Sequence, residues 1–187
     1  MKNRMIIVIA PSGGGKSTFL QRILLEKKDL ATTVTYTTRK MRKGESEGSP
    51  YHFVDQNRFA ELRDNAFFVE WAEVHGKWYG TPQHQIDDIW KSDRNVIMDV
   101  DVQGAMSLRK KYAQALTLFI LPPSIDELRR RVISREGGTP ADLELRMKNA
   151  QKEIAMAPLF DRQLINDDFE TSYAQFKKMI EEYLKST

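Results

Sequence analysis

The sequence predicts an α/β protein whose core is a parallel sheet covered by helices on both faces. Continuous apolar runs at residues 5–9, 95–100 and 116–121 are typical of buried strands, because a strand covered on both faces does not need polar residues at alternate positions. An amphipathic helical pattern follows each run. Buried strands that alternate with helices indicate a three-layer core with a parallel sheet.

Each element has its own signal along the chain. Pro122 and Pro123 stop the third strand, and Ser124 can cap the next helix, with Glu127 at the third helical position. In chain order, we expect a strand at 5–9, a helix around 19–24, a strand at 95–100, a helix through 106–108, a strand at 116–121, helices at 124–135 and from 139 to about 154, a short strand at 164–165 and a helix at 172–184.

Residues 34–84 break this alternation because they are richer in charge, glycine and aromatic side chains. Strand patterns at 51–54 and 67–74 surround one helical pattern at 57–63. We predict a small mixed α+β insertion in the core, not a linker. A second break at 135–140 contains two glycines between helices, which is typical of a hinge.

Composition excludes several classes of function. The chain has 187 residues, with 29 Lys and Arg against 26 Asp and Glu, so its formal charge of +3 does not indicate a nucleic-acid partner. The absence of cysteine excludes disulfides, thiolate metal sites and cysteine nucleophiles. No apolar run is long enough for a membrane span or a signal peptide, so we expect a cytoplasmic protein with no membrane partner.

A phosphate-binding loop follows the first strand, with the sequence APSGGGKST at residues 10–18. Glycines let backbone N–H groups wrap a phosphate, and the next helix presents its positive N-terminus. Lys16 can reach the β- and γ-phosphates, and the Ser17 hydroxyl can bind Mg²⁺. The residues expected to bind ATP are Ser12, Gly13, Gly14, Gly15, Lys16, Ser17 and Thr18.

The sequence of this loop allows two interpretations, a nucleotide-binding site or a turn with no ligand. A glycine-rich turn that binds nothing is the alternative, but the apolar strand before the loop and the amphipathic helix after it favour a nucleotide site. Ala10 stands where the strict pattern has glycine. The loop alone leaves open a GTPase, an ATPase, a small-molecule kinase or a nucleotide kinase.

Within the insertion, three features indicate a second substrate. Arg39 and Arg42 suit a second phosphate, although a solvated basic loop would have the same sequence. The hydroxyls of Tyr51 and Tyr79 could complete that clamp, or the rings could simply pack. Glu70 lies in an apolar strand, where it either forms a structural ion pair or accepts from the N1–H and 2-amino donors of guanine.

Three stretches together resemble the guanylate kinase family: VTYTTRKMRKGESEGSPYHFV, FFVEWAEVHGKWYGTP and VIMDVDVQGA. The resemblance runs from about residue 5 to about residue 183, in order and without a large gap. It implies the fold of a P-loop kinase with a GMP-binding insertion and a helical lid. The implied organisation is one domain over 1–187, with a core at 1–33, 85–124 and 155–187, a GMP-binding region at 34–84 and a lid region at 125–154.

The resemblance also implies residue roles around GMP. The phosphate would be held by Arg39, Arg42, Tyr51 and Tyr79, and the guanine edge would be read by Glu70 with Thr35 and Thr81. Asp99 and Asp101 match the family's acidic pair near GMP and hydrated Mg²⁺, although capping of the next helix would also explain them. Thr35 stands where serine is usual and Met41 where proline is common.

Arginines in the region 125–154 could stabilise the charge of a transferred phosphoryl group. By residue type alone they could equally form a solvated basic helix face. The resemblance assigns Arg131, Arg135 and Arg146, with Lys16, to catalysis, although the segment EGGTPADLELRM departs from the usual lid. Asn166 matches a position near the donor adenine.

The function that the resemblance implies is ATP + GMP ⇌ ADP + GDP, with Mg²⁺ as cofactor. GMP, dGMP and ATP would be the small-molecule partners, in purine nucleotide metabolism, and the sequence does not fix the oligomeric state. One alternative is a guanylate kinase-like module that binds proteins. Another is a P-loop kinase with a different acceptor, such as another nucleoside monophosphate or a phosphosugar.

Overall fold

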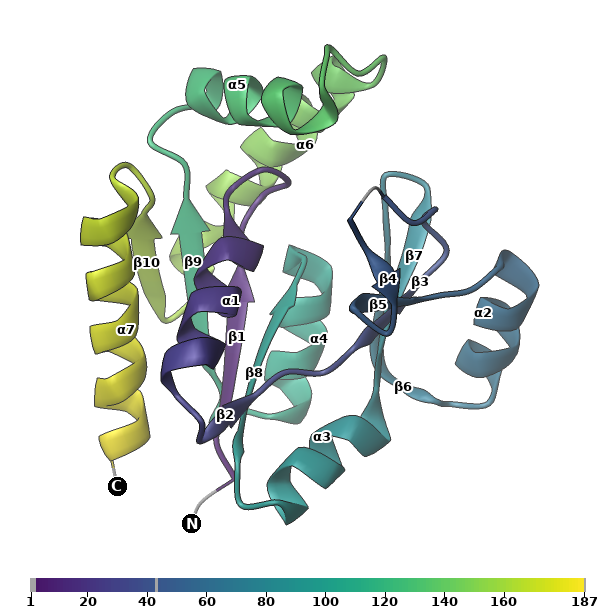
Figure 1. Cartoon of the computed structure of the whole chain (residues 1–187), viewed down its shortest axis with the longest axis vertical. Helices are drawn as coiled ribbons and strands as arrows, with labels where there is room; N and C mark the ends of the chain where they lie inside the picture. Colours follow the sequence, from purple (N-terminus) through teal and green to yellow (C-terminus); the bar gives the residue numbers. More distant parts are fainter. Residues whose placement is uncertain (1–2, 43, 187) are drawn as a thin grey trace.

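The computed structural model describes residues 3–42 and 44–186 of the chain. Figure 1 shows a core with a second sheet beside it and two helices across its top. The strands are β1 (Met5–Ile9), β2 (Leu30–Ala31), β3 (Thr35–Thr37), β4 (Ser46–Glu47), β5 (Pro50–Phe53), β6 (Phe68–Val74), β7 (Lys77–Pro82), β8 (Asn95–Val100), β9 (Leu116–Leu121) and β10 (Arg162–Ile165). The helices are α1 (Lys16–Glu26), α2 (Gln56–Asp64), α3 (Gln83–Lys91), α4 (Val102–Lys111), α5 (Ile125–Glu136), α6 (Leu143–Ala155), the short 3₁₀ helix η1 (Ala157–Leu159) and α7 (Phe169–Lys185).

The core sheet has the strand order β10-β9-β1-β8-β2, and all of its neighbouring strands are parallel. β1 lies at the centre, where Ile7 pairs with Met98 on one side and with Thr117 on the other. The three apolar runs are therefore the three central strands, and the predicted α/β fold with a parallel sheet is confirmed.

Helices cover both faces of this sheet. On one face, Ile6 and Val8 of β1 pack with α1 and α7, where the rings of Phe19 and Phe176 meet edge to face at 5.1 Å. On the other face, Ile7 belongs to the apolar cluster that α3 and α4 also enter. Because successive strand side chains point to opposite faces, one apolar strand contributes to two separate parts of the core.

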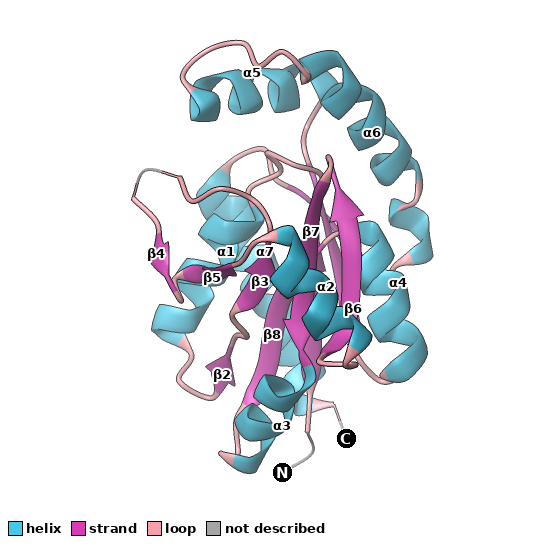
Figure 2. Cartoon of the chain, turned by 90° about the vertical axis from the view of Figure 1, so that its right-hand side faces the viewer, coloured by secondary structure: helices cyan, strands magenta, loops and turns pink. Residues whose placement is uncertain are grey.

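The second sheet has the order β4-β5-β3-β7-β6 and is mixed, since β7 runs antiparallel to both β3 and β6. Helix α2 packs against it through Phe59, whose ring stacks on Phe68 with centroids 4.7 Å apart. This sheet lies beside α4 in Figure 2. The mixed α+β character expected for residues 34–84 is what the structure has there.

In Figure 2, helices α5 and α6 lie over the core. The two helices pack together through Leu128, Val132, Leu143 and Met147. The predicted cap of α5 is confirmed, because Ser124 Oγ accepts from Glu127 N at 3.1 Å. The prediction that α6 starts near residue 139 is wrong by about a turn. Leu143 N donates to Pro140 O at 3.1 Å, so a tight turn precedes the helix.

Other element bounds also differ from the prediction. α7 begins at Phe169 and not at residue 172, because Asp168 caps it by accepting from Thr171 N at 2.9 Å. β10 starts two residues earlier than expected. The elements predicted from the sequence did not include β2, β3, β4, β7 or α3. Among residues 3–42 and 44–186, no helix combines the length and the apolar character needed to cross a membrane.

Candidate active site

The loop after β1 has the geometry of a phosphate cradle. Gly13 and Gly15 adopt φ values of +91° and +98°, which favour glycine, and Gly15 is the residue before α1. A Cβ added to Gly14 would lie 2.8 Å from the Cβ of Ala10. The alanine that departs from the strict pattern therefore fits only because position 14 has no side chain. The hydroxyls of Ser17 and Thr18 are exposed in the first turn of α1.

Lys16 lies at the centre of a charged group. Its Nζ donates to the carbonyl oxygen of Ala10. Burial lowers the pKa of the Lys16 ammonium group, while the charges of Asp99, Glu153 and Asp101 act in the opposite direction. The ammonium group therefore lies within the electrostatic influence of three carboxyl groups, two of them at the carboxyl end of β8 and one on α6.

Of these three carboxyl groups, Glu153 was not among the site residues predicted from the sequence. Burial raises its pKa to about 7, against the opposing charge of Lys16, and the charge of Asp101 raises it further. Glu153 is seven residues after Arg146 on the same helix, so the two side chains lie on one helical face. That spacing is the signal that could have identified it.

The acidic pair at the end of β8 offers oxygen donors for a magnesium ion. Burial raises the pKa of Asp99, and the charge of Lys16 counteracts this. Asp101 caps α4 by accepting from Gly104 N at 2.7 Å, so the capping role considered for it is confirmed. Together with the exposed Ser17 hydroxyl, these carboxylates are the ligand type that Mg²⁺ prefers, and Mg²⁺ commonly keeps several waters as well. In the described part of the chain, no three His, Cys, Asp or Glu residues are grouped as a complete metal cage.

Glu70 is buried on β6 beside Thr81 of β7. Glu70 is only 7% exposed, and Thr81 Oγ1 donates to Glu70 Oε1 at 2.5 Å. Burial raises the pKa of Glu70 to about 7, a hydrogen bond from Thr81 opposes this, and the charge of Asp101 adds to it. No cation pairs with Glu70 among the ion pairs of the described residues, which disfavours a purely structural salt bridge.

The residues expected at a second phosphate lie near one another on the second sheet. Tyr51 pairs in register with Thr35, and its ring meets that of Tyr79 edge to face at 5.9 Å. Burial raises the pKa of the Tyr51 hydroxyl, and the charge of Asp99 raises it further. Arg39 lies 5.2 Å from the centroid of the Tyr51 ring.

Arg39 is not free in this structure. Glu45 accepts from both of its terminal nitrogens, at 3.0 and 2.8 Å. The same carboxylate accepts from the backbone N–H of Arg42 at 2.7 Å. Glu45, which was not among the predicted site residues, therefore orients the basic loop that carries both arginines.

Arginines of α5 and α6 approach the phosphate loop and the second sheet. Arg135 Nη2 lies 3.4 Å from Ser12 Oγ, and Arg131 Nη2 donates to the backbone oxygen of Asn166 at 3.1 Å. Asn166 is buried and donates to Gly14 O at 3.1 Å. The structure thus gives Asn166 a supporting role in the loop, and its expected place near the donor adenine stays a prediction. Arg146 joins Arg135 and Arg42 at the side chain of Glu136.

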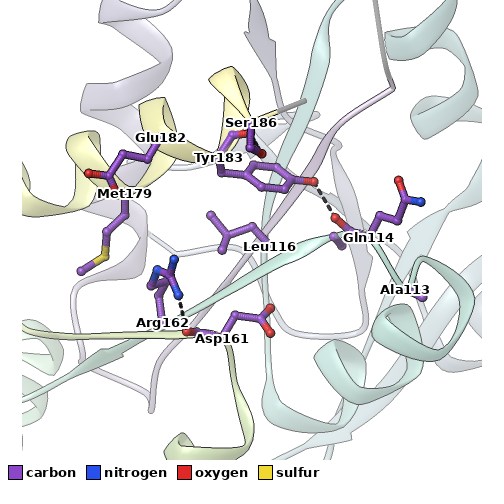
Figure 3. Close-up of a pocket in the computed structure, with 10 residues that line it drawn as sticks. Ala113, Gln114, Leu116, Asp161, Arg162, Met179, Glu182, Tyr183 and Ser186 are labelled. Carbon is purple, nitrogen blue, oxygen red and sulfur yellow. Dashed lines mark hydrogen bonds between the residues drawn. The ribbon is translucent and has the colours of Figure 1, made fainter.

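A cavity of about 320 Å³ lies at the opposite end of the core sheet. Figure 3 shows it between the start of β9 and the end of α7, with Tyr183 donating to Gln114 O at 2.7 Å. Asp161 and Arg162 line it, and none of the expected site residues does. The phosphate loop follows the carboxyl end of β1, so this cavity is remote from the chemistry.

The parallel α/β core, the glycine loop between β1 and α1, and Arg135 beside that loop are typical of a P-loop nucleotide-binding protein. Comparison with known proteins narrows the class. The family model for guanylate kinase matches residues 2–183. The chain belongs to the guanylate kinase family, and its class of enzyme is nucleoside monophosphate kinase.

Individual relatives agree with this assignment. The chain is 50% identical over 184 residues to a guanylate kinase of Bdellovibrio bacteriovorus, an alignment that covers 98% of this chain and 100% of that one. It is 44% identical to a guanylate kinase of Nitratidesulfovibrio vulgaris, covering 92% and 84% of the two chains. A crystal structure of guanylate kinase from Anaplasma phagocytophilum superposes with a TM-score of 0.82 at 30% identity, covering 98% of this chain and 88% of that one.

Proposed function

We propose that this protein transfers the γ-phosphate of ATP to GMP, giving ADP and GDP, and that it accepts dGMP as well. The observation that carries the choice of acceptor is Glu70, a buried carboxylate that accepts from the Thr81 hydroxyl and has no cationic partner among residues 3–42 and 44–186. Guanine presents two adjacent donors to such an acceptor, whereas adenine presents an acceptor at its N1 position. A base with the wrong pattern would leave the buried carboxylate unpaired, which is costly.

ATP would be held by residues 12–18, with its phosphates on the backbone N–H groups of the loop and the ammonium group of Lys16 between the β- and γ-phosphates. GMP would be held by the second sheet, with Thr35, Glu70 and Thr81 at the base. Arg39, Arg42, Tyr51 and Tyr79 would hold its phosphate. The two substrates would then meet above Asp99 and Asp101, at the carboxyl end of the core sheet.

Catalysis would come from positioning and from neutralisation of charge, without a covalent enzyme intermediate. Arg131, Arg135 and Arg146 would close over the transferred group and exclude water, which limits hydrolysis of ATP. Mg²⁺ would be held by Ser17 and the waters that Asp99 and Asp101 orient, and it supplies charge neutralisation at the phosphates when bound. We place this reaction in cytoplasmic purine nucleotide metabolism.

The test is an assay of ADP release with ATP and Mg²⁺, in which GMP, dGMP, AMP, CMP and UMP are offered one at a time. We expect turnover with GMP and dGMP and little with AMP. Fast turnover with another monophosphate would refute the assignment of Glu70 as the base reader. GMP binding with no ADP release from any acceptor would refute the enzymatic proposal and favour a guanylate kinase-like binding module.

A further inference from the structure

One carboxylate oxygen binds three arginines that come from three separate segments. Oε1 of Glu136 accepts from Arg42 Nη2 at 3.1 Å, from Arg135 Nη2 at 2.9 Å and from Arg146 Nη1 at 3.4 Å. Arg42 belongs to the loop after β3, Arg135 to the last turn of α5 and Arg146 to α6. Figure 1 shows that α5 ends on the side of the core where the second sheet lies.

Three guanidinium groups this close together repel one another unless an anion lies between them. The Glu136 carboxylate supplies one negative charge, and Asp142, 2.9 Å from Arg146 Nε, supplies a second, against three positive ones. The planar fork of a guanidinium group can bind two oxygens of either a carboxylate or a phosphate. A phosphate group can therefore take the same position and carries more negative charge than the carboxylate. All three arginines are among the residues expected to bind substrate phosphates.

The ionisation of Glu136 agrees with this arrangement. Partial burial acts to raise its pKa, but the hydrogen bond from Arg135 and the charges of Arg42, Arg135 and Arg146 outweigh that effect and lower it. The side chain is therefore an anion at neutral pH. Its exposed fraction is 25%, against 16% for Arg146, so solvent reaches the carboxylate.

The chain around Glu136 also gives it room to move. Gly137, the residue that ends α5, has φ of +72° and is followed by Gly138. A Cβ added to either glycine would meet no atom within 4 Å. A small change in this segment can withdraw the Glu136 carboxylate without disturbing packed neighbours.

We propose that Glu136 is a built-in substitute for a substrate phosphate: it holds Arg42, Arg135 and Arg146 together until a phosphate group displaces it. This inference rests on the proposed function for the identity of the phosphate, which would come from GMP or ATP. Glu136 is a positioning residue and competes with the substrate for the same three donors.

Competition has a measurable consequence for affinity. The ion pairs of Glu136 are partly exposed, and such pairs are individually weak, so loss of the carboxylate should strengthen anion binding by about three- to ten-fold, which corresponds to about 0.6–1.4 kcal/mol. Glu136→Gln is the test variant because it keeps the shape of the side chain and removes its charge. Glu144→Gln is the matched control. Glu144 pairs with Arg129 on the same two helices and with none of the three arginines among the ion pairs of the described residues, and its side chain is 79% exposed.

The first measurement is sulfate binding by titration calorimetry at fixed ionic strength, which needs no catalysis. We expect Glu136→Gln to bind sulfate about three- to ten-fold more tightly than the unmodified protein, and Glu144→Gln to match the unmodified protein. The second measurement is steady-state kinetics with GMP. Glu136→Gln should have a lower KM for GMP, by a similar factor, whereas loss of a purely structural contact would leave KM unchanged or raise it.

Unchanged or weaker sulfate binding by Glu136→Gln would overturn the proposal, and so would an equal gain in Glu144→Gln. Should Glu136→Gln fail to fold, Glu136→Asp keeps the charge on a shorter side chain and should give a smaller gain in the same direction; no gain there would also overturn it. If the protein phosphorylates no monophosphate, the proposed function fails, but the sulfate comparison still decides the role of Glu136.

Discussion

The hydrogen bonds of Glu70 give the sharpest prediction about specificity. In Glu70→Gln, the amide keeps one acceptor but turns an N–H donor toward a guanine donor. The variant therefore loses a hydrogen bond that involves a charged group, and such a bond contributes about 1.5–3 kcal/mol. In its place, the N–H donor of the glutamine lies opposite an N–H donor of guanine. We expect kcat/KM for GMP to fall roughly 150-fold, which corresponds to a loss of about 3 kcal/mol of transition-state binding, and we expect a much smaller change for AMP. Equal discrimination between GMP and AMP in variant and parent would refute the reasoning.

The pH dependence of GMP binding checks the same residue independently. Burial raises the pKa of Glu70 from 4.5 to about 7, so this carboxyl is largely protonated below pH 7 when no base is bound. Guanine donors favour the ionised form, so binding must remove that proton. The KM for GMP should therefore rise as pH falls through 7, by up to about ten-fold per pH unit. Glu70→Gln should lose this part of the pH dependence and keep the part due to the GMP phosphate. An identical pH profile in both proteins would contradict the assignment.

Three further outcomes test the phosphate loop and the core. Lys16→Met should remove most turnover while circular dichroism and melting temperature stay near those of the parent; a normal rate in the folded variant would refute the site. Gly14→Ala places a Cβ 2.8 Å from that of Ala10 and should weaken ATP binding, measured by titration, by at least about ten-fold. Its control is Gly138→Ala, whose added Cβ meets nothing within 4 Å; equal affinities in the two variants would argue against a tightly fitted loop. Phe176→Ala should lower the free energy of unfolding by about 3–5 kcal/mol in a denaturant titration, because this side chain is fully buried, and a loss below 1 kcal/mol would contradict the packing described for α7.

The core of the fold was predictable because its signals are local. β1, β8 and β9 are continuous apolar runs. Such a run is typical of a strand in a parallel sheet that is covered on both faces. The second sheet gave weaker signals. β3 and β4 have three and two residues, and both residues of β4 are exposed, so pairing with neighbours and not composition makes them strands. α3 was overlooked although Ile86 and Ile89 are buried at helical spacing.

The candidate site was predictable to the extent that its residues form motifs. The loop at 10–18 and the resemblance at 34–84 identified residues around both expected substrates. Glu136 could not be found this way, because only Arg135 is adjacent to it in the sequence. Arg42 lies 94 residues before it and Arg146 lies 10 residues after it. A cluster assembled from three segments by the fold has no fixed spacing in the sequence.

The packing of α5 on the phosphate loop links the two halves of the site. A Cβ on Gly13 would lie 2.9 Å from Val132 Cγ2 and 3.2 Å from Leu128 Cδ1, so α5 rests directly on the loop. Any movement of this helix changes what the loop touches. If ATP binding and engagement of the α5 arginines each favour one helix position, a free energy of coupling joins them. Such coupling is reciprocal, so the factor by which ATP tightens GMP binding must equal the factor by which GMP tightens ATP binding.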